Sequence, residues 1–164
     1  MIGQKQIIVI IGLVFAILLI VCNLNHAENN TNIVKMQNPF IKAETLDVAA
    51  QGAGFALFCP KTFKDYKKTQ ISFIRNKLIE VTYGNAQNSI NVRKSNQNKQ
   101  DISGDYNHYD DVISKDLNGL TVTYKGHNDE ISTAIFANDD YSYSIHARNP
   151  LTKSLVDSLI LQIR

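Results

Sequence analysis

The stretch that decides the fold is YSYSIH, residues 141–146, in which apolar or aromatic side chains alternate with polar ones. An alternation with a period of two puts one set of side chains on one face of a β-strand and the other set on the opposite face. Residues 79–83, 90–93 and 120–125 repeat this alternation. Strands with one apolar and one polar face are typical of an antiparallel sheet that is covered on a single side.

Turn-like connections between these stretches predict hairpins. The connections lie at residues 76–77, 84–88 and 138–140, and further strand-like runs lie at residues 55–58, 70–75 and 131–137. The expected number of strands is therefore about seven. The run at residues 55–58 is apolar throughout, so we expect a buried strand there that is closed by Pro60. The polar interval 95–118 is expected to be a loop or a crossover.

A short helix is predicted for residues 45–51, near the start of this pattern. Thr45 is a favourable N-cap and Asp47 lies in the first turn, where a carboxylate favours a helix. Gly52 and Gly54 are expected to end the helix.

A second helix is predicted at the C-terminus, after the favourable N-cap and N1 pair Asn149-Pro150. Apolar residues recur there at helical spacing: Leu151, Leu155, Val156, Leu159, Ile160 and Ile163. This stripe requires an apolar surface to pack on, and the sheet supplies one. The predicted fold class is therefore α+β, a curved antiparallel sheet with the C-terminal helix packed on its inner face.

The N-terminus carries an apolar run that predicts the compartment. Residues 7–21 are apolar or glycine, and the run continues to Leu24 with one interruption at Asn23. Such a run is at the short end of what crosses a bilayer core of about 30 Å. Lys5 precedes the run and no basic residue follows it before Lys35. The positive-inside bias therefore places the N-terminus in the cytoplasm and the rest of the chain outside.

Three fates of this segment stay open, and all three place the domain outside the plasma membrane. The first is an uncleaved signal anchor, which the length of the run favours. The second is a lipoprotein signal ending in Cys22 as the lipidated residue, although Val21 stands where a lipidation box has a small residue. The third is a secretory signal peptide cleaved after Ala27, although Asn25 is not the preferred small residue.

The sequence therefore divides into three parts. Residues 1–24 are a signal anchor or signal peptide, residues 25–38 an Asn-rich flexible tether, and residues 39–164 an extracytoplasmic domain. The composition, with 44% hydrophobic and 20% charged residues, excludes global disorder. Contact with the plasma membrane is expected through residues 7–24. The net charge of +2 does not call for nucleic acid, and no nucleic-acid partner is expected.

Charge is distributed unevenly along the domain. Residues 61–99 hold nine Lys or Arg and two acidic residues, whereas residues 101–140 hold nine acidic residues and two Lys. If the basic half forms one patch, it suits an anionic wall polymer or lipid headgroups. Solvated strand faces and loops are the simpler interpretation of the same charges.

The order of several motifs resembles that of a known family. DISGDYN at residues 101–107 is followed by a strand ending in Lys125-Gly126 and by the runs at residues 134–136 and 141–145. This order resembles a family of domains of unknown function in secreted lipoproteins and single-span membrane proteins of Gram-positive bacteria. The resemblance covers roughly residues 38–163. It implies a curved sheet, distantly similar to those of periplasmic lipoprotein carriers and anti-sigma-factor partners, and it carries no catalytic residues and no established ligand.

The stretch 101–111 holds the most suggestive group of possible ligands. Calcium prefers oxygen ligands, which are supplied here by Asp101, Ser103, Asp105, Asn107 and Asp110. The spacing is not that of an EF-hand, and the same residue types build tight turns, which is the competing interpretation. The four histidines lack a metal-binding spacing. No firm metal site and no cofactor are expected.

No catalytic signature is present in the sequence. There is no Gly-x-Ser-x-Gly elbow and no phosphate-binding glycine loop, and the apolar neighbours of Cys59 predict a buried thiol. We therefore expect a membrane-anchored, extracytoplasmic, non-enzymatic binding or scaffolding domain that acts through its polar sheet face or the Asp101 segment. An envelope protein or an anionic wall polymer is the expected partner. The alternatives are a sensor or regulatory ectodomain and a cell-envelope enzyme.

Overall fold

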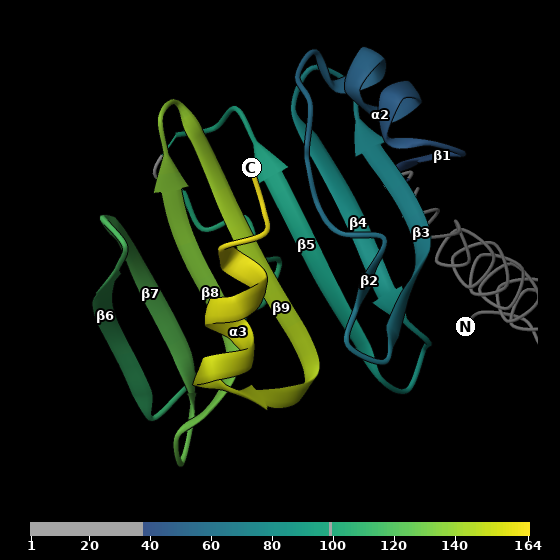
Figure 1. Cartoon of the computed structure of the whole chain (residues 1–164). Helices are drawn as coiled ribbons and strands as arrows, with labels where there is room; N and C mark the ends of the chain where they lie inside the picture. Colours follow the sequence, from purple (N-terminus) through teal and green to yellow (C-terminus); the bar gives the residue numbers. More distant parts are fainter. Residues whose placement is uncertain (1–37, 99) are drawn as a thin grey trace, which may run out of the picture. The chain divides into compact units, whose positions relative to one another are not determined.

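A computed structural model of the chain describes residues 38–98 and 100–164, and Asn38–Arg164 form one compact unit. The strands are β1 (Ile41–Ala43), β2 (Thr62–Phe63), β3 (Tyr66–Ile74), β4 (Leu78–Gly84), β5 (Ser89–Ser95), β6 (Asp111–Leu117), β7 (Leu120–His127), β8 (Glu130–Asn138) and β9 (Tyr141–Thr152), and the helices are α2 (Leu46–Ala53) and α3 (Lys153–Ile160) (Figure 1). No helix within this described part is long and apolar enough to cross a membrane. The predicted membrane segment, the possible lipidation site Cys22 and the tether up to residue 37 lie outside it.

The strands form one antiparallel sheet in the order β1-β3-β4-β5-β9-β8-β7-β6, and β2 pairs with β3 beside this order. The α+β class with a C-terminal helix on a curved sheet is confirmed. The described sheet has nine strands instead of about seven, because three strands were missed and the one expected at residues 55–58 is absent. Of the missed strands, β1 and β2 are too short to stand out, and β6 lies in the interval that was expected to be a loop. In β6, Val112 and Ile113 are adjacent, so its apolar residues do not alternate with polar ones.

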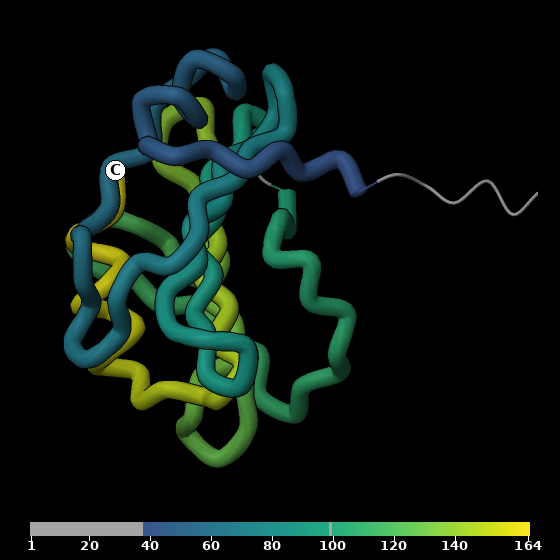
Figure 2. Tube along the Cα trace, turned by 90° about the vertical axis from the view of Figure 1, so that its right-hand side faces the viewer, coloured from purple at the N-terminus to yellow at the C-terminus, as the bar shows by residue number. Residues whose placement is uncertain are grey.

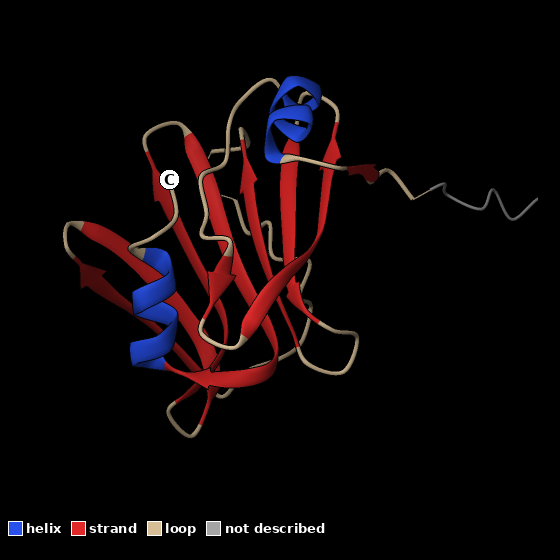
Figure 3. Cartoon of the chain, turned by 45° about the vertical axis from the view of Figure 1, so that its right-hand side comes forward, coloured by secondary structure: helices blue, strands red, loops and turns tan. Residues whose placement is uncertain are grey.

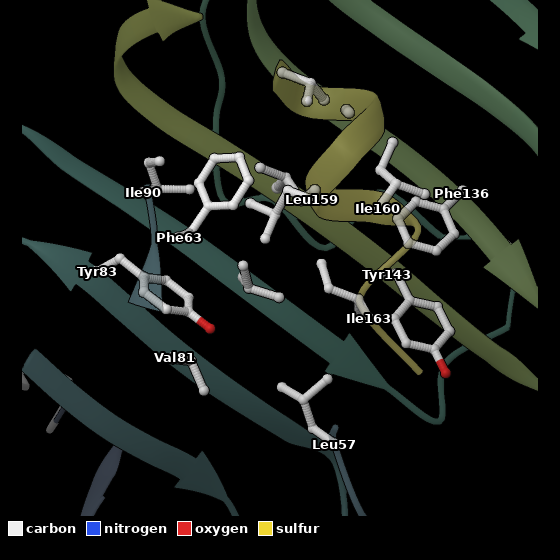
Figure 4. Packing of buried hydrophobic residues seen from close by; sticks show 14 of the residues in the cluster. Leu57, Phe63, Val81, Tyr83, Ile90, Phe136, Tyr143, Leu159, Ile160 and Ile163 are labelled. Carbon is white, nitrogen blue, oxygen red and sulfur yellow. The ribbon is translucent and has the colours of Figure 1, made fainter. Parts of the chain in front are cut away.

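One face of the sheet, the inner face, is apolar and covered. Its side chains include Val81 and Tyr83, which are fully buried (Figure 4). Leu159 and Ile160 of α3, which packs on β8 and β9, belong to the same buried cluster, as does Phe63 of β2. The opposite face, the outer face, is crossed by residues 96–98 and 100–110, which we call the crossover segment (Figure 2). Figure 2 shows α3 and the crossover segment on opposite sides of the sheet.

The structure confirms the first predicted helix and extends it. The Thr45 side chain accepts a hydrogen bond from the backbone N–H of Val48 at 3.2 Å, as an N-cap does. The helix continues through Gly52 to Ala53, so Gly52 does not end it. Gly54 caps it in the left-handed conformation with φ of 83°, which glycine adopts without a steric cost.

The C-terminal helix begins three residues later than its sequence signals indicate. The pair Asn149-Pro150 lies inside β9, which runs on to Thr152 and bends before α3 (Figure 3). In the β8–β9 ladder the register passes from His146 to Leu151 without a partner between them. Pro150, which has no N–H to donate, therefore lies where no ladder bond is required.

The strand predicted for residues 55–58 is wrong. This segment is extended but pairs with no strand, and Phe58 and Arg164 instead exchange backbone hydrogen bonds of 2.8 and 3.0 Å. Leu57 is buried, whereas Phe58 is 66% exposed, so the apolar run is only partly a core segment. Cys59, expected to be buried, is half-buried against the core.

Candidate functional site

The sheet register lines up polar side chains across the outer face. One row crosses five strands and consists of Gln70, Thr82, Asn91, His146 and Thr133. A second row consists of Ser72, Glu80, Arg93 and Ser144. These are the polar positions of the alternating strands, and they form the polar sheet face that the sequence predicts.

The charged side chains of the second row form an ion pair with each other. Arg93 Nε lies 2.7 Å from Glu80 Oε2, and the two side chains are only 17% and 11% exposed. Ser72 donates to the other oxygen of Glu80, and Arg93 Nη1 donates to the carbonyl of Ile102 in the crossover segment. The Arg93 guanidinium also lies over the ring of Phe40. This ion pair joins the crossover segment to the sheet, and its charges are not free for a ligand.

The crossover segment is fastened to the polar face along its length. Ser142 Oγ of β9 donates to the carbonyl of Gln97 at 2.6 Å and accepts from the backbone N–H of Gln100. Asp101 lies 2.7 Å from Lys125 Nζ of β7. Asp110 lies 2.9 Å from His127 Nδ1 of the same strand. Asp101 and Asp110, two of the possible calcium ligands in the sequence, therefore each contact a side chain of β7. They do not converge on one common point.

Two of these acidic residues also build tight turns. Asp101 accepts from the backbone N–H and the hydroxyl of Ser103, at 2.9 and 2.6 Å. Asp105 accepts from the backbone N–H and the side-chain amide of Asn107, at 3.1 and 2.8 Å. Gly104 between them has φ of 69°, and a Cβ there would lie 2.4 Å from Arg93 Nη1. These contacts favour the turn interpretation of the stretch.

A calcium site at Asp101, Ser103, Asp105, Asn107 and Asp110 has little support from this geometry, because both carboxylates that face the sheet already accept protein hydrogen bonds. Within residues 38–98 and 100–164, no group of three or more His, Cys, Asp or Glu side chains could hold a metal ion. We do not propose a metal site there.

Asp105 is the centre of the network under the crossover segment. Its side chain is 1% exposed, and its Oδ2 accepts from the hydroxyls of Tyr109 and Thr133. Burial opposes ionisation of this carboxyl, but the hydrogen bonds from Thr133, Tyr109 and the Asn107 backbone, with the nearby His146, outweigh it and lower the pKa of Asp105 to about 2. Asp105 is therefore a buried carboxylate at neutral pH.

His146 is the one histidine that joins this network. Its Nδ1 lies 2.9 Å from Thr133 Oγ1 and 3.4 Å from Asp105 Oδ2. A hydroxyl nucleophile, a histidine and an acid form a relay only when the hydroxyl and the acid contact different ring nitrogens. Here both contact the same nitrogen, and Thr133 directs its proton to Asp105. The arrangement holds the segment in place and does not activate a nucleophile.

Part of the outer face is left open by the crossover segment. Here the surface over β3, β4, β5 and the end of β9 forms a groove of about 520 Å³, which we call the open groove. Its polar lining includes Thr69, Gln70, Thr82, Ser89, Asn91 and Arg148. Arg148 is exposed, and no described carboxylate pairs with it. Asn91 Oδ1 is buried without a described hydrogen-bond partner. The groove thus offers a free guanidinium beside hydroxyl and amide groups.

A larger hollow of about 700 Å³ lies elsewhere, beside Phe58, Cys59 and Leu161. Its lining comes from residues 58–60 and from the C-terminal residues Leu161, Gln162 and Arg164, and it holds no row of polar groups fixed by neighbouring strands. We give the open groove more weight because its polar groups come from several strands that fix their positions.

A charged cluster on the inner side fixes α3 to the sheet. Tyr124 donates to Asp157 at 2.6 Å, and Lys153 lies 2.6 Å from the second oxygen of the same carboxylate. Burial, with Asp157 beside the phenol, raises the pKa of Tyr124 above its ordinary range. The Lys153 ammonium also lies 4.4 Å from the Tyr124 ring centre. All three groups are occupied with one another, so the cluster is explained by packing of the helix.

Sequence reasoning missed the residues that define the open groove. In the sequence, Arg148 comes two residues after the alternating stretch 141–146, and nothing distinguishes it from an ordinary surface arginine. Only the pairing of β5 with β9 places it near Asn91. It also missed Tyr106, which projects from the crossover segment and is 98% exposed. An apolar or aromatic residue in a polar loop was the available signal for Tyr106, and it is a weak one.

In comparisons with known proteins, no family model, no curated protein and no solved structure matches the chain. A proposal about its function therefore depends on the geometry described above. The resemblance of residues 38–163 to a family of uncharacterised domains therefore stays a prediction.

Proposed function

We propose that this protein is a membrane-tethered, extracytoplasmic and non-enzymatic binding module whose binding surface is the open groove of the outer face. The ligand that the groove suits best is an anionic, hydroxyl-bearing wall polymer. The observation that carries the proposal is the unpaired Arg148 beside the polar row of Gln70, Thr82 and Asn91.

The chemistry of the groove supports this class of ligand. A guanidinium binds carboxylate or phosphate groups with two parallel hydrogen bonds, which a free Arg148 can offer. Gln70 and Thr82 can both donate and accept, as a polyhydroxylated chain requires.

Exposed basic residues of the domain support attraction of an anionic polymer. Lys61, Lys64 and Lys67 are exposed around β2 and β3, with Asp65 as the acidic residue among them. Arg75 and Lys77 are exposed at the β3–β4 turn, whereas two further members of the basic half are internal. Arg93 is paired with Glu80, and Lys94 is buried, donates to the carbonyl of Ala56 and lies 4.2 Å from the ring centre of Tyr141. The outward basic charge therefore lies around β2 and β3 and at the β3–β4 turn, and it would raise the local concentration of an anionic ligand at the domain.

The cellular location in this proposal rests on the sequence. The apolar residues 7–24 would anchor the chain in the plasma membrane and place the domain outside. The non-enzymatic part is supported by the contacts of His146 and Asp105, which hold the crossover segment. No contact favours the sensor alternative over the binding module.

The test is co-sedimentation of the full-length chain, held in lipid nanodiscs, with a purified anionic wall polymer. Reversing the guanidinium charge by Arg148→Glu should weaken binding about tenfold or more, because one charged hydrogen-bonded contact is lost and a repulsion is added. Arg75→Glu is the matched control, since Arg75 is exposed at the β3–β4 turn and outside the groove. Equal binding by Arg148→Glu and the wild type, or no binding by the wild type, would contradict the proposal.

A further inference from the structure

One edge of the described sheet is formed by a long strand, β6, whose outward backbone N–H and C=O groups pair with no neighbouring strand. The edge strand β6 is exposed along its whole length apart from Leu117, and Val112 and Ile113 are 57% and 41% exposed. The other edge strand, β1, has only three residues. Proteins usually shorten or cover edge strands, because an open edge pairs with other strands. A seven-residue edge with two exposed apolar side chains is therefore a candidate interaction surface.

The hairpin fixes which backbone groups of β6 face outward. Leu117 and Leu120 flank the two-residue turn at Asn118-Gly119, so they form a hydrogen-bonded pair. Hydrogen-bonded and non-hydrogen-bonded pairs alternate along an antiparallel ladder. The odd-numbered residues of β6 therefore bond to β7. The even-numbered residues, Val112, Ser114 and Asp116, direct their N–H and C=O groups to the open edge.

We propose that β6 pairs in antiparallel orientation with β6 of a second copy of this chain, with Ile113 opposite Ile113 at a two-fold axis. In this register Val112 lies opposite Ser114 of the other copy, and each such pair exchanges two backbone hydrogen bonds. Asp111 lies opposite Lys115 of the other copy, and the symmetry repeats this pair. The two apolar Ile113 side chains contact each other between the two ion pairs.

The charges of β6 select this register over its neighbours. Moving the axis to Ser114 would place Asp111 opposite Leu117 and Ile113 opposite Lys115. Moving it to Lys115 would place two ammonium groups opposite each other, which destabilises a strand pair. Among these, only the Ile113 register places both charged residues of the inner face of β6, Asp111 and Lys115, opposite a residue of the other sign. On the outer face this register places Asp116 opposite Asp110 of the other copy, so the like-charge pair is confined to the end of the strand.

Asp111 and Lys115 are available for these contacts. Neither forms an ion pair within the described part of the chain. Asp111 Oδ2 accepts from the backbone N–H of Asn128 at 3.1 Å, which positions the carboxylate and leaves its other oxygen open. Both residues and Ile113 line a hollow of about 190 Å³ on the inner side of β6, beside Tyr124. A second Ile113 at the axis would cover apolar surface at the rim of this hollow.

The experiment is sedimentation velocity of the full-length chain in detergent micelles over a range of concentrations. The wild type should show a concentration-dependent dimer. Asp111→Lys alone and Lys115→Asp alone should each weaken the dimer about tenfold, since each places like charges opposite each other twice. The double variant Asp111→Lys/Lys115→Asp restores opposite charges and should recover the dimer. This recovery also shows that the single variants did not merely fail to fold.

A second variant tests the backbone pairing. Ser114→Pro removes an N–H that faces the open edge, so it should abolish the dimer while the far-ultraviolet circular dichroism stays that of the wild type. Lys42→Asp on the opposite edge strand β1 is the control and should leave the dimer unchanged. A dimer that survives all β6 substitutions, for example one held by residues 1–37, would overturn the proposal, and so would a wild type that stays monomeric.

Discussion

The inner and outer faces of the same sheet are stabilised in different ways. The inner face buries apolar side chains such as Val81 and Ile145 in one cluster with Leu159 of α3 and Phe63 of β2. The outer face buries polar side chains, and the crossover segment bonds several of them around Asp105, while Ser144 Oγ is buried without a described partner. Where the crossover segment does not reach, the open groove keeps polar groups without partners. Stability and binding therefore depend on different parts of the sheet. The inner face and the covered part of the outer face stabilise the fold, and the uncovered part of the outer face is available to a ligand.

The largest expected effect comes from the inner face. Leu159→Ala should lower the free energy of unfolding by about 3 kcal/mol, because Leu159 is fully buried and its truncation leaves a cavity. Urea denaturation measures this loss. Leu161→Ala, two residues further along and 47% exposed, is the control and should cost about 1 kcal/mol or less. Equal losses would mean that α3 does not pack on the sheet as described.

The covered part of the outer face should come next. Asp105→Ala removes the acceptor shared by Tyr109 and Thr133 and should cost about 1–3 kcal/mol, since these buried hydroxyls lose their partner. Asp110→Ala removes only an exposed contact with His127 and should cost less than about 1 kcal/mol. If the two substitutions cost the same, the crossover segment is not held through Asp105.

The pH dependence of the free energy of unfolding gives a second test of the role of Asp105 in the covered part of the outer face. The pKa of Asp105 is about 2 in the folded protein, below the ordinary value near 3.9. Its ionised form therefore stabilises the fold fully above about pH 4, and this contribution is lost as the pH falls toward 2. Burial opposes ionisation of Asp101, but hydrogen bonds from Lys125 and Ser103 outweigh it and lower its pKa, so Asp101 adds to the loss of stability as the pH falls below the ordinary value. Urea unfolding between pH 2 and 6 should show a shallower decline for Asp105→Asn than for the wild type, and parallel curves would contradict this.

The smallest effect on stability is expected in the open groove. Gln70 is exposed, so Gln70→Ala should change the free energy of unfolding by no more than about 0.5 kcal/mol. The same substitution should weaken binding of the anionic polymer about threefold, because it removes one hydrogen-bonding side chain. A thermal melt and co-sedimentation measure the two quantities. A large loss of stability without loss of binding would reverse the roles assigned to the two parts of the outer face.

Much of the sheet is readable from the sequence because its strands alternate strictly. Residues 141–146 and the other alternating stretches of the chain predict the polar and apolar faces of the sheet. The apolar stripe around Leu159 predicts the helix that covers the apolar face. The sequence misplaces the start of that helix because Asn149-Pro150 satisfies the rules for a helix start as well as those for a gap in a ladder. It misses β6 because adjacent Val112 and Ile113 break the alternation.

The candidate site was less predictable, for a physical reason. Asp101 and Asp105 attract attention as charges, but their partners Lys125 and Thr133 lie on strands far along the chain. Whether an acidic residue binds a ligand or closes a turn depends on which strand lies under it. The open groove depends in the same way on the non-local pairing of β5 with β9, which no local pattern specifies.

The most direct test of this account is hydrogen–deuterium exchange of the full-length chain with and without the anionic wall polymer. The account predicts slower exchange in the strands that line the open groove, residues 69–91 and the end of β9 near Arg148, and unchanged exchange in the described crossover segment. Slower exchange confined to the crossover segment, or no change anywhere, would contradict the assignment of the open groove as the binding surface.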